Sequence, residues 1–446
     1  MSRHTASAMR WHKDKRIEEE GVMRHPVDSI AWKEFDKTYA EFAEDPRNVR
    51  LGLATNGFNP FGNMSTSYTP GKDLDVYMQP LIDELKELWE DGIQTYDKVS
   101  ESAFNMRTAV IWTINDFPAY ANLSGWSTQG YLACPVCNKD ASSTGIRSKV
   151  CYTGHRRYLS MDHSFRKSPL FNGKSEMRPS PREFSGHDIL DQLDLILPSN
   201  PGKHPDNKKR KRREDFELNW TKKSIFFELD YWPMLKIRHN LDVMHIEKNI
   251  CDNIVGTLLS IEGKSMDTYK ARLDLADMKI RKHLWLKPKG DKTNKMEKFR
   301  GEYVFKPAER TAFCEFLKFV KFPDGYASNI SRNVNVDEGT VSGLKSHDFH
   351  MLMQRLLPVG IRKDLKKSIY SPLVELSSFF QQICAKTLRV ADLDNLEENI
   401  VMTLCKLEKI FPPAFFDVMV HLAVHLPQEA KLGGPVGYRW MYPIER

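Results

Sequence analysis

The chain has 446 residues, enough for two or three domains, and its 41% hydrophobic and 28% charged residues are typical of a soluble globular protein. No apolar run approaches the roughly 20 residues of a membrane span, and Met1–Thr5 lacks the hydrophobic segment of a signal peptide. We therefore expect no membrane partner and an intracellular protein with reduced thiols, so that the seven cysteines are metal ligands or buried thiols. A net charge of +7 permits a polyanionic partner without requiring one.

An N-terminal helical segment is predicted over residues 1–48. One face of a helix in this segment is aromatic, and we expect it to pack on the next domain; it consists of Trp32, Phe35, Tyr39 and Phe42. Residues 49–55 alternate as a β-strand does, and residues 75–91 have the apolar stripe of a helix that ends at Gly92. A second strand, residues 108–116, ends in the carboxylate of Asp116, so the order here is strand, helix, strand.

From about residue 240 onward, helical periodicity predominates and few strands are expected. Residues 241–259 carry Ile250, Ile254 and Leu258 at a spacing of four. Further helices are predicted at residues 307–320, 344–357, 365–388, 392–410 and 413–426. The fold class predicted from this order is α+β.

Four cysteine and histidine residues have the spacing of a zinc site. Cys134 and Cys137 form a Cys-x2-Cys pair, and after thirteen intervening residues Cys151 and His155 form a second pair. Zn²⁺ binds thiolate and imidazole ligands in a tetrahedron and supplies folding energy to a small insert, here residues 130–165. His163 is an alternative ligand, and the alternative to a zinc site is a loop with reduced, unliganded thiols.

Two further histidines lie one helical turn apart near the end of the chain. Asp417, His421 and His425 are spaced by four residues, and two such histidines can bind a metal. No Glu lies between them as in a metalloprotease helix, and Pro427 follows directly. We interpret them as packed or hydrogen-bonded helix histidines.

A run of six cations, Lys208, Lys209, Arg210, Lys211, Arg212 and Arg213, lies in a Pro/Gly/Asn-rich stretch. Such a density of like charge keeps a segment solvated, which predicts a loop over residues 199–215. The run is interpreted as a nuclear-import signal or a DNA phosphate contact, and the alternative is a solubilising linker.

Several longer motifs resemble those of the plant CACTA (En/Spm-type) transposases. They cover nearly the whole chain and comprise Trp11–Arg16, Leu51–Phe61, Asn115–Pro118 with Leu123–Trp126, Cys134–Cys137 and Leu241–Asn249. The later part, with Leu356–Arg362, Gly433–Val436 and Arg439–Arg446, resembles the helical domain of unknown function that follows the catalytic region in those proteins.

The resemblance implies an RNase H-like core in which three acidic residues hold two Mg²⁺ or Mn²⁺ ions for phosphodiester transfer on DNA. It also places a zinc-binding insert between the second and third acids. By position the first acid corresponds to residue 56, the second to Asp116 and the third to Glu247, with Asp242 as the competing candidate. The implied organisation is an N-terminal segment, a core over residues 49–290 and a helical C-terminal domain over residues 300–446.

Periodicity favours Glu247 as the third acid. On a helix it shares the apolar face of Ile250 and Ile254, where a carboxylate is costly unless it meets a cation or a metal. The alternative is a buried Glu paired with Arg238 or Lys248. For Asp116 the alternative is a residue that caps the turn before Phe117-Pro118.

The chain departs from the family pattern in three places. Position 56 is Asn, which keeps an oxygen ligand but lacks the charge that two neighbouring cations need. An apolar stretch that would supply two further strands is absent between Tyr68 and Pro70, which leaves the strand at 49–55 an exposed edge. The third departure is a chain that stops within a family motif, as expected for a transposon remnant.

These observations predict a degenerate, inactive transposase that retains DNA binding and a zinc insert. Its DNA contacts would be the basic run together with Arg156, Arg157 and Lys236, and its location would be the nucleus. One alternative is a non-enzymatic nuclear module whose C-terminal helices bind a protein partner or a second copy. The other is an active metal-dependent nuclease.

Overall fold

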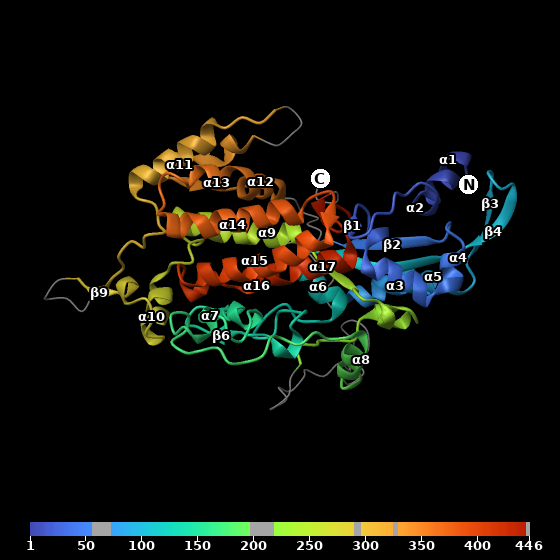
Figure 1. The fold of residues 1–446 in the computed structure, drawn as a ribbon, viewed down its shortest axis with the longest axis horizontal. Coiled ribbons are helices and arrows are strands. Elements are labelled where there is room, and N and C mark those ends of the chain that lie inside the picture. The colour runs from blue at the N-terminus through green and yellow to red at the C-terminus, as the bar shows by residue number, and fades with distance from the viewer. Residues whose placement is uncertain (56–72, 197–217, 290–295, 324–328, 443–446) are drawn as a thin grey trace.

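The computed structural model describes residues 1–55, 73–196, 218–289, 296–323 and 329–442. A small parallel sheet lies toward one end of the long axis, and helices from the C-terminal half fill the middle (Figure 1). The predicted mixture of helices and a small sheet is confirmed. No helix among the described residues is long and apolar enough to cross a membrane.

The sheet has three parallel strands in the order β2-β5-β8, namely Val49–Thr55, Thr108–Asn115 and His239–Leu241. All eight residues of the central strand β5 are buried, as expected for a strand covered on both faces. Thr55, Asn115 and Leu241 are register partners across the three strands. The sheet therefore has one edge at which the carboxyl ends of all three strands meet.

Strand β2 accommodates a large side chain of its neighbour. A Cβ atom on Gly52 would lie 2.8 Å from Trp112 Nε1, so only glycine fits beside the buried indole. At the carboxyl end the Thr55 hydroxyl donates to Asn115 Oδ1 at 2.6 Å, and Asn115 Nδ2 donates to Thr113 Oγ1 at 2.7 Å. The first bond joins β2 to β5 where the strands end, and the second, within β5, orients the Asn115 amide for it.

The helices of the N-terminal half are α1 Arg3–Met9, α2 Trp11–Asp14, α3 Ile30–Thr38, α4 Ala40–Glu44, α5 Leu74–Glu90 and α6 Phe117–Ser124. Of these, α3, α4 and α5 share a buried core with β5, and α6 packs against β5 and β8. The predicted aromatic face does pack on the next elements, since Phe35 and Phe42 contact Trp89 of α5 and Phe35 contacts Tyr231. The single helix predicted there is interrupted at Tyr39, which lies between α3 and α4.

A β-hairpin that the sequence analysis did not predict joins α5 to β5. Its strands are β3 Ile93–Asp97 and β4 Ser102–Met106. The remaining strands have two residues each: β1 Val22–Met23, β6 Thr144–Gly145, β7 Val150–Cys151, β9 Lys287–Pro288, β10 Met296–Glu297, β11 Val334–Asn335, β12 Thr340–Val341 and β13 Leu388–Arg389. The expectation of few strands in the second half is thus confirmed for the described residues.

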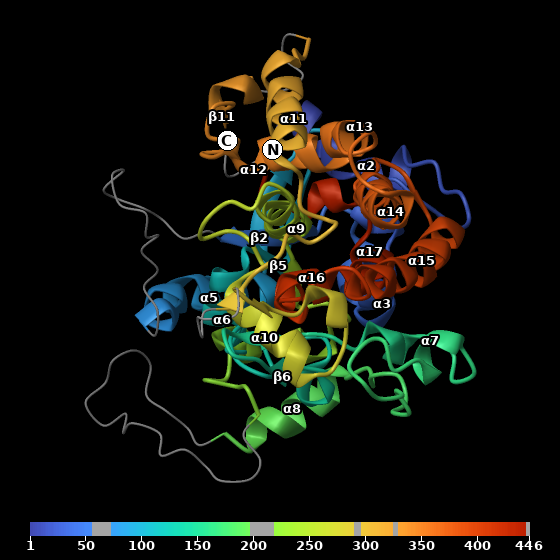
Figure 2. The same cartoon turned by 90° about the vertical axis from the view of Figure 1, so that its left-hand side faces the viewer.

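The helical part is built around α9, Val243–Leu258, of which Asp242 is the N-cap. The helices predicted at residues 307–320, 344–357, 365–388 and 392–410 are present, whereas residues 413–426 are divided between two 3₁₀ turns and a short helix. The helices of this part are α10 Tyr269–Asp277, α11 Pro307–Phe319, α12 Ser346–Met351, α13 Leu357–Gly360, α14 Lys367–Ile383, α15 Val390–Glu408, α16 Val418–Leu422 and α17 Leu426–Gly433. One buried core contains apolar residues of α9 together with those of α11 to α17, so α9 packs with the C-terminal helices (Figure 2).

The C-terminal helices also contact the sheet. Helix α17 packs on α3 and β8, and β13 pairs with β1 near the N-terminus. On α17, Glu429 Oε1 accepts the backbone N–H of Leu241 at 2.8 Å, and Arg439 donates to Asn240 Oδ1 at 2.8 Å. The last strand of the sheet is therefore held by side chains from the end of the chain.

Residues 126–196 form a layer of short elements below the helices, with α7 Ser164–Lys167 and α8 Gly186–Asp194 (Figure 1). Buried arginines organise this layer. Arg156 and Arg157 are only 1% and 3% exposed, and they donate to backbone carbonyls such as those of Ser168 and Pro179. The expectation that these two arginines contact DNA is wrong, because their guanidinium groups are used inside the layer.

We predict a pH dependence of stability from Glu429. Burial raises the pKa of its carboxyl from 4.5 to about 7, although Arg439 opposes this shift. A raised pKa in the folded state means a stabilising contribution that is complete below about pH 4.5 and is lost as the pH rises through about 7. The contribution is at most about 3 kcal/mol.

The variant Glu429→Gln keeps an oxygen that can accept the Leu241 N–H but does not titrate. Urea unfolding between about pH 5.5 and 7.5 should therefore show a smaller loss of stability with pH than the wild type shows. The exposed Glu398→Gln on α15 serves as the control. Equal pH slopes for Glu429→Gln and the wild type would contradict this assignment.

Candidate metal centre

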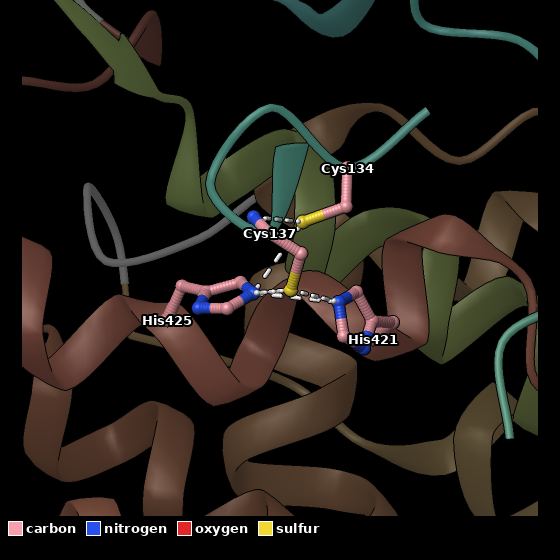
Figure 3. A group of neighbouring side chains, drawn as sticks. All are labelled: Cys134, Cys137, His421 and His425. Atoms are coloured by element: carbon pink, nitrogen blue, oxygen red, sulfur yellow. Dashed lines mark hydrogen bonds between the residues drawn. The ribbon is translucent and has the colours of Figure 1, made fainter. Parts of the chain in front are cut away.

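The Cys-x2-Cys pair lies in a tight, buried turn. Cys134 and Cys137 are 0% and 2% exposed, and the backbone N–H of Cys137 points to Cys134 Sγ at 3.4 Å. Asn138 follows with a φ of 52°, a left-handed conformation that Asn tolerates better than most residues. The turn thereby directs both sulfur atoms to the same side (Figure 3).

Two histidines face these sulfur atoms from a helical segment at the other end of the chain. Asp417 caps α16 by accepting the N–H groups of Met419 and Val420, and the helix continues as a 3₁₀ turn over Ala423–His425. His421 and His425 therefore stand one turn apart on one side of the segment, with both rings directed at Cys137 (Figure 3).

The ligand atoms of this Cys/His centre (Cys134, Cys137, His421 and His425) all lie within 4.8 Å of one another. Cys137 Sγ is 3.3 Å from the Nε2 atoms of both histidines, which are 3.3 Å apart. Cys134 Sγ is 3.4 Å from His425 Nε2. A tetrahedral zinc ion with ordinary bond lengths requires separations of about 3.3 to 3.8 Å between its ligand atoms. The residues present fit such an ion.

The two thiols differ in acidity. Burial raises the pKa of Cys134 well above its ordinary value, and the neighbouring Cys137 adds to this effect. The pKa of Cys137 is well below its ordinary value because Cys134 hydrogen-bonds to it and because the two imidazoles lie close. Cys137 therefore ionises more readily than Cys134, and a bound cation would favour the thiolate form of both.

Tyrosine and histidine rings surround the centre. The Tyr158 hydroxyl lies 3.1 Å from Cys137 Sγ, and the Tyr152 ring lies 5.4 Å from that of His421. The Tyr152 hydroxyl donates to Gly130 O at 2.7 Å and accepts from Ala133 N at 2.8 Å, which fixes the approach to the Cys-x2-Cys turn. Such contacts hold metal ligands in place.

Cys151 and His155, predicted as the second pair of ligands, lie outside this group. His155 is buried, and its Nδ1 bonds to Glu408, whose Oε1 also accepts the N–H of Gly154 at 3.1 Å. Cys151 lies in β7, where burial raises the pKa of its thiol to about 11. The structure thus differs from the prediction in the second half of the ligand set, which α16 and the following turn supply.

His421 and His425 were noticed in the sequence but interpreted as packed histidines. Cys134 and His425 are 291 residues apart, so no local spacing connects the two halves of the centre. The available signal was a Cys-x2-Cys pair, which supplies half of a zinc site, together with two histidines on one helical face. His163, the alternative ligand, instead caps α7 through the N–H of Phe165.

Two of the candidate acidic residues lie at the carboxyl edge of the sheet. Asp116 and Asp242 directly follow the register partners Asn115 and Leu241 of neighbouring strands. Each caps the next helix: Asp116 accepts the N–H of Ala119 at 2.8 Å, and Asp242 accepts those of Met244 and His245 at 3.2 Å. Asp242 also accepts the N–H of Met441 at 3.3 Å.

Glu247 lies farther along α9 and is fully buried, as its apolar helical face predicts. Burial raises the pKa of its carboxyl, against the opposing effect of His350. His350 Nδ1 lies 2.6 Å from Oε2, and Gln354 Nε2 donates to Oε1 at 2.9 Å. These partners come from the C-terminal helices rather than from Arg238 or Lys248, the partners considered in the sequence analysis.

Two sequence-based site predictions fall outside the described residues. Asn56 follows β2 directly in the sequence, and the basic run occupies residues 208–213. Both remain predictions.

Two known families match parts of the chain. Residues 20–70 and 67–196 match the family described as Transposase family tnp2, and the two segments meet where the sequence analysis places the gap. Residues 383–446 match a domain of unknown function, DUF4218, which is found in plant transposon proteins. No curated protein and no solved structure matches the chain.

The Cys/His centre takes two ligands from each matched region. Cys134 and Cys137 lie within residues 67–196, and His421 and His425 lie within residues 383–446. A metal bound there would connect two regions that the sequence separates widely.

Metal content distinguishes the observed ligand set from the predicted one. We expect Cys137→Ala and His425→Asn each to abolish zinc binding at the Cys/His centre, and Cys151→Ala to leave it intact. Plasma mass spectrometry of the purified proteins measures the loss. Chelation of the wild type should lower its unfolding midpoint by on the order of 10 °C, because a structural metal contributes directly to folding. Loss of zinc in Cys151→Ala with retention in His425→Asn would contradict the assignment.

Proposed function

The chain is a transposase-family protein, and we propose that it is a DNA-binding derivative of a CACTA (En/Spm-type) transposase that no longer transfers DNA strands. Its scaffold is an incomplete RNase H-like core with a metal-stabilised attachment to the C-terminal helices. The nucleus is its proposed location, because the DNA to which it would bind lies there.

The register of the sheet is the observation that supports this proposal most. Asp116 and Asp242 directly follow paired residues of neighbouring parallel strands, so both lie at the same edge of the sheet. Acidic residues that converge from strand ends suit two-metal chemistry on a phosphodiester. The same register supports Asp242, rather than Glu247, as the third acid.

The environment of these carboxylates supports the loss of catalysis. Asp242 accepts the backbone N–H groups of Met244, His245 and Met441, and Asp116 accepts that of Ala119. Position 56, which follows the first strand, is an amide in place of an acid. Two adjacent divalent cations repel each other and need several anionic ligands. A site with fewer anionic ligands, whose carboxylate oxygens already accept backbone hydrogen bonds, therefore binds them poorly.

The Cys/His centre would serve a structural role under this proposal. Four protein ligands close the coordination shell of a zinc ion and leave no position for a substrate. The ion would supply a bond between the turn at Cys134 and the segment at His421. This function requires no DNA contact from the insert itself.

Strand cleavage in Mg²⁺ or Mn²⁺ tests the proposed inactivity. The wild type and Asp116→Asn are both expected at background, because the site lacks a full set of anions. If Asn56→Asp cleaves DNA, the loss of activity is due to the amide at position 56. If Asn56→Asp is also inactive, the incomplete core contributes to the loss of activity as well. Wild-type cleavage that Asp116→Asn removes would contradict the proposal.

The proposed DNA binding has its own test. Neutralising all six cations from Lys208 to Arg213 should weaken binding to duplex DNA. The slope of log affinity against log salt concentration should become less negative by up to about 5. The exposed Lys363 and Lys386, neutralised together, are the control. Tight binding of a protein partner without salt-dependent DNA affinity would instead favour the non-enzymatic interaction module.

A further inference from the structure

A second group of metal-ligating side chains surrounds Glu247. Its carboxylate on α9, the imidazole of His350 on α12 and the thiol of Cys384 at the end of α14 have ligand atoms that lie within 4.8 Å of one another. These three residues come from separate helices and share no member with the Cys/His centre. We propose that Glu247, His350 and Cys384 form a second metal site of the zinc class.

The donor set has the chemistry of a borderline transition metal. Carboxylate oxygen, imidazole nitrogen and thiolate sulfur all bind Zn²⁺, whereas Mg²⁺ prefers oxygen ligands alone. The site is therefore distinct from the carboxylate site implied for the ancestral transposase, for which the sequence analysis considered Glu247 as the third acid.

Gln354 converges on the same group of side chains. Its Nε2 lies 2.9 Å from Glu247 Oε1, 3.1 Å from His350 Nδ1 and 3.1 Å from Phe380 O. One amide nitrogen carries only two hydrogen atoms, so Gln354 alone does not serve all three of these atoms. A cation among the Glu, His and Cys donors would satisfy all three at once.

The backbone of this segment is unusual in the same place. Helix α12 passes into a π-helical turn over Leu352–Leu356, which includes Gln354. Such wide turns are rare and occur often at functional sites. Here the turn places His350 and Gln354 together against the buried carboxylate of Glu247.

Access for a metal comes from one side. The side chain of Glu247 is 1% exposed, but that of His350 is 19% exposed and Cys384 is half-buried. With three protein ligands and a partly exposed face, a water molecule would complete the tetrahedron, as in open zinc sites.

Metal stoichiometry of the full-length protein tests this proposal. The wild type should bind about two equivalents of Zn²⁺ by mass spectrometry, and Cys384→Ser, His350→Asn and Cys137→Ala should each bind about one. A wild type with one equivalent, which Cys137→Ala loses, would overturn the proposal. So would two equivalents that persist in both Cys384→Ser and His350→Asn.

A measurement on the unmodified chain guards against variants that fail to fold. In protein already loaded with about one equivalent of Zn²⁺, a second equivalent should slow alkylation of Cys384 by about tenfold or more, because a metal-bound thiolate is shielded. Peptide mass spectrometry follows this residue, and a chelator should restore the original rate. An unchanged rate overturns the proposal. Neither readout depends on DNA binding or cleavage, so the inference and the proposed function can fail separately.

Discussion

The convergence of two sulfur and two nitrogen atoms at the Cys/His centre is the constraint on which the architecture depends. Cys137 and His421 are 284 residues apart in the chain, yet their ligand atoms lie 3.3 Å apart in a buried position. Closing a loop of this length costs conformational entropy, which a metal bond of sufficient strength offsets. The layer of short elements over residues 126–196 has little regular secondary structure, so its position against the C-terminal helices depends on such specific contacts.

The C-terminal end of the chain also stabilises the sheet. Glu429 and Arg439 bond to residues of β8, and Met441 N bonds to Asp242 at the sheet edge. Strand β8 lies outside both matched regions, but it pairs with β5, which lies within the transposase match. The region matched as a domain of unknown function thus holds the strand that borders the transposase match, which gives a physical reason for the two regions to occur in one chain.

Much of this fold follows from local sequence patterns. The strand at 49–55, the buried strand ending at Asp116 and the helices from residue 307 onward have periodicities that predict them within a few residues. The hairpin of β3 and β4 was missed because its strands are mostly exposed and lack a clear alternation. Half of the Cys/His centre was predictable from Cys134 and Cys137, but the partners His421 and His425 are set by tertiary packing. The buried state of Glu247 was predictable, whereas its bonds to His350 and Gln354 were not, since a π-helical turn creates them.

X-ray absorption at the zinc edge tests the central claim most directly, because it reports the ligand atoms themselves. The measurement is best made on the variant Glu247→Gln/Cys384→Ser, so that the Cys/His centre supplies the signal alone. Two sulfur ligands at about 2.3 Å and two nitrogen ligands at about 2.0 Å are the result that the account predicts. A shell of three sulfur ligands, or one without sulfur, would contradict it.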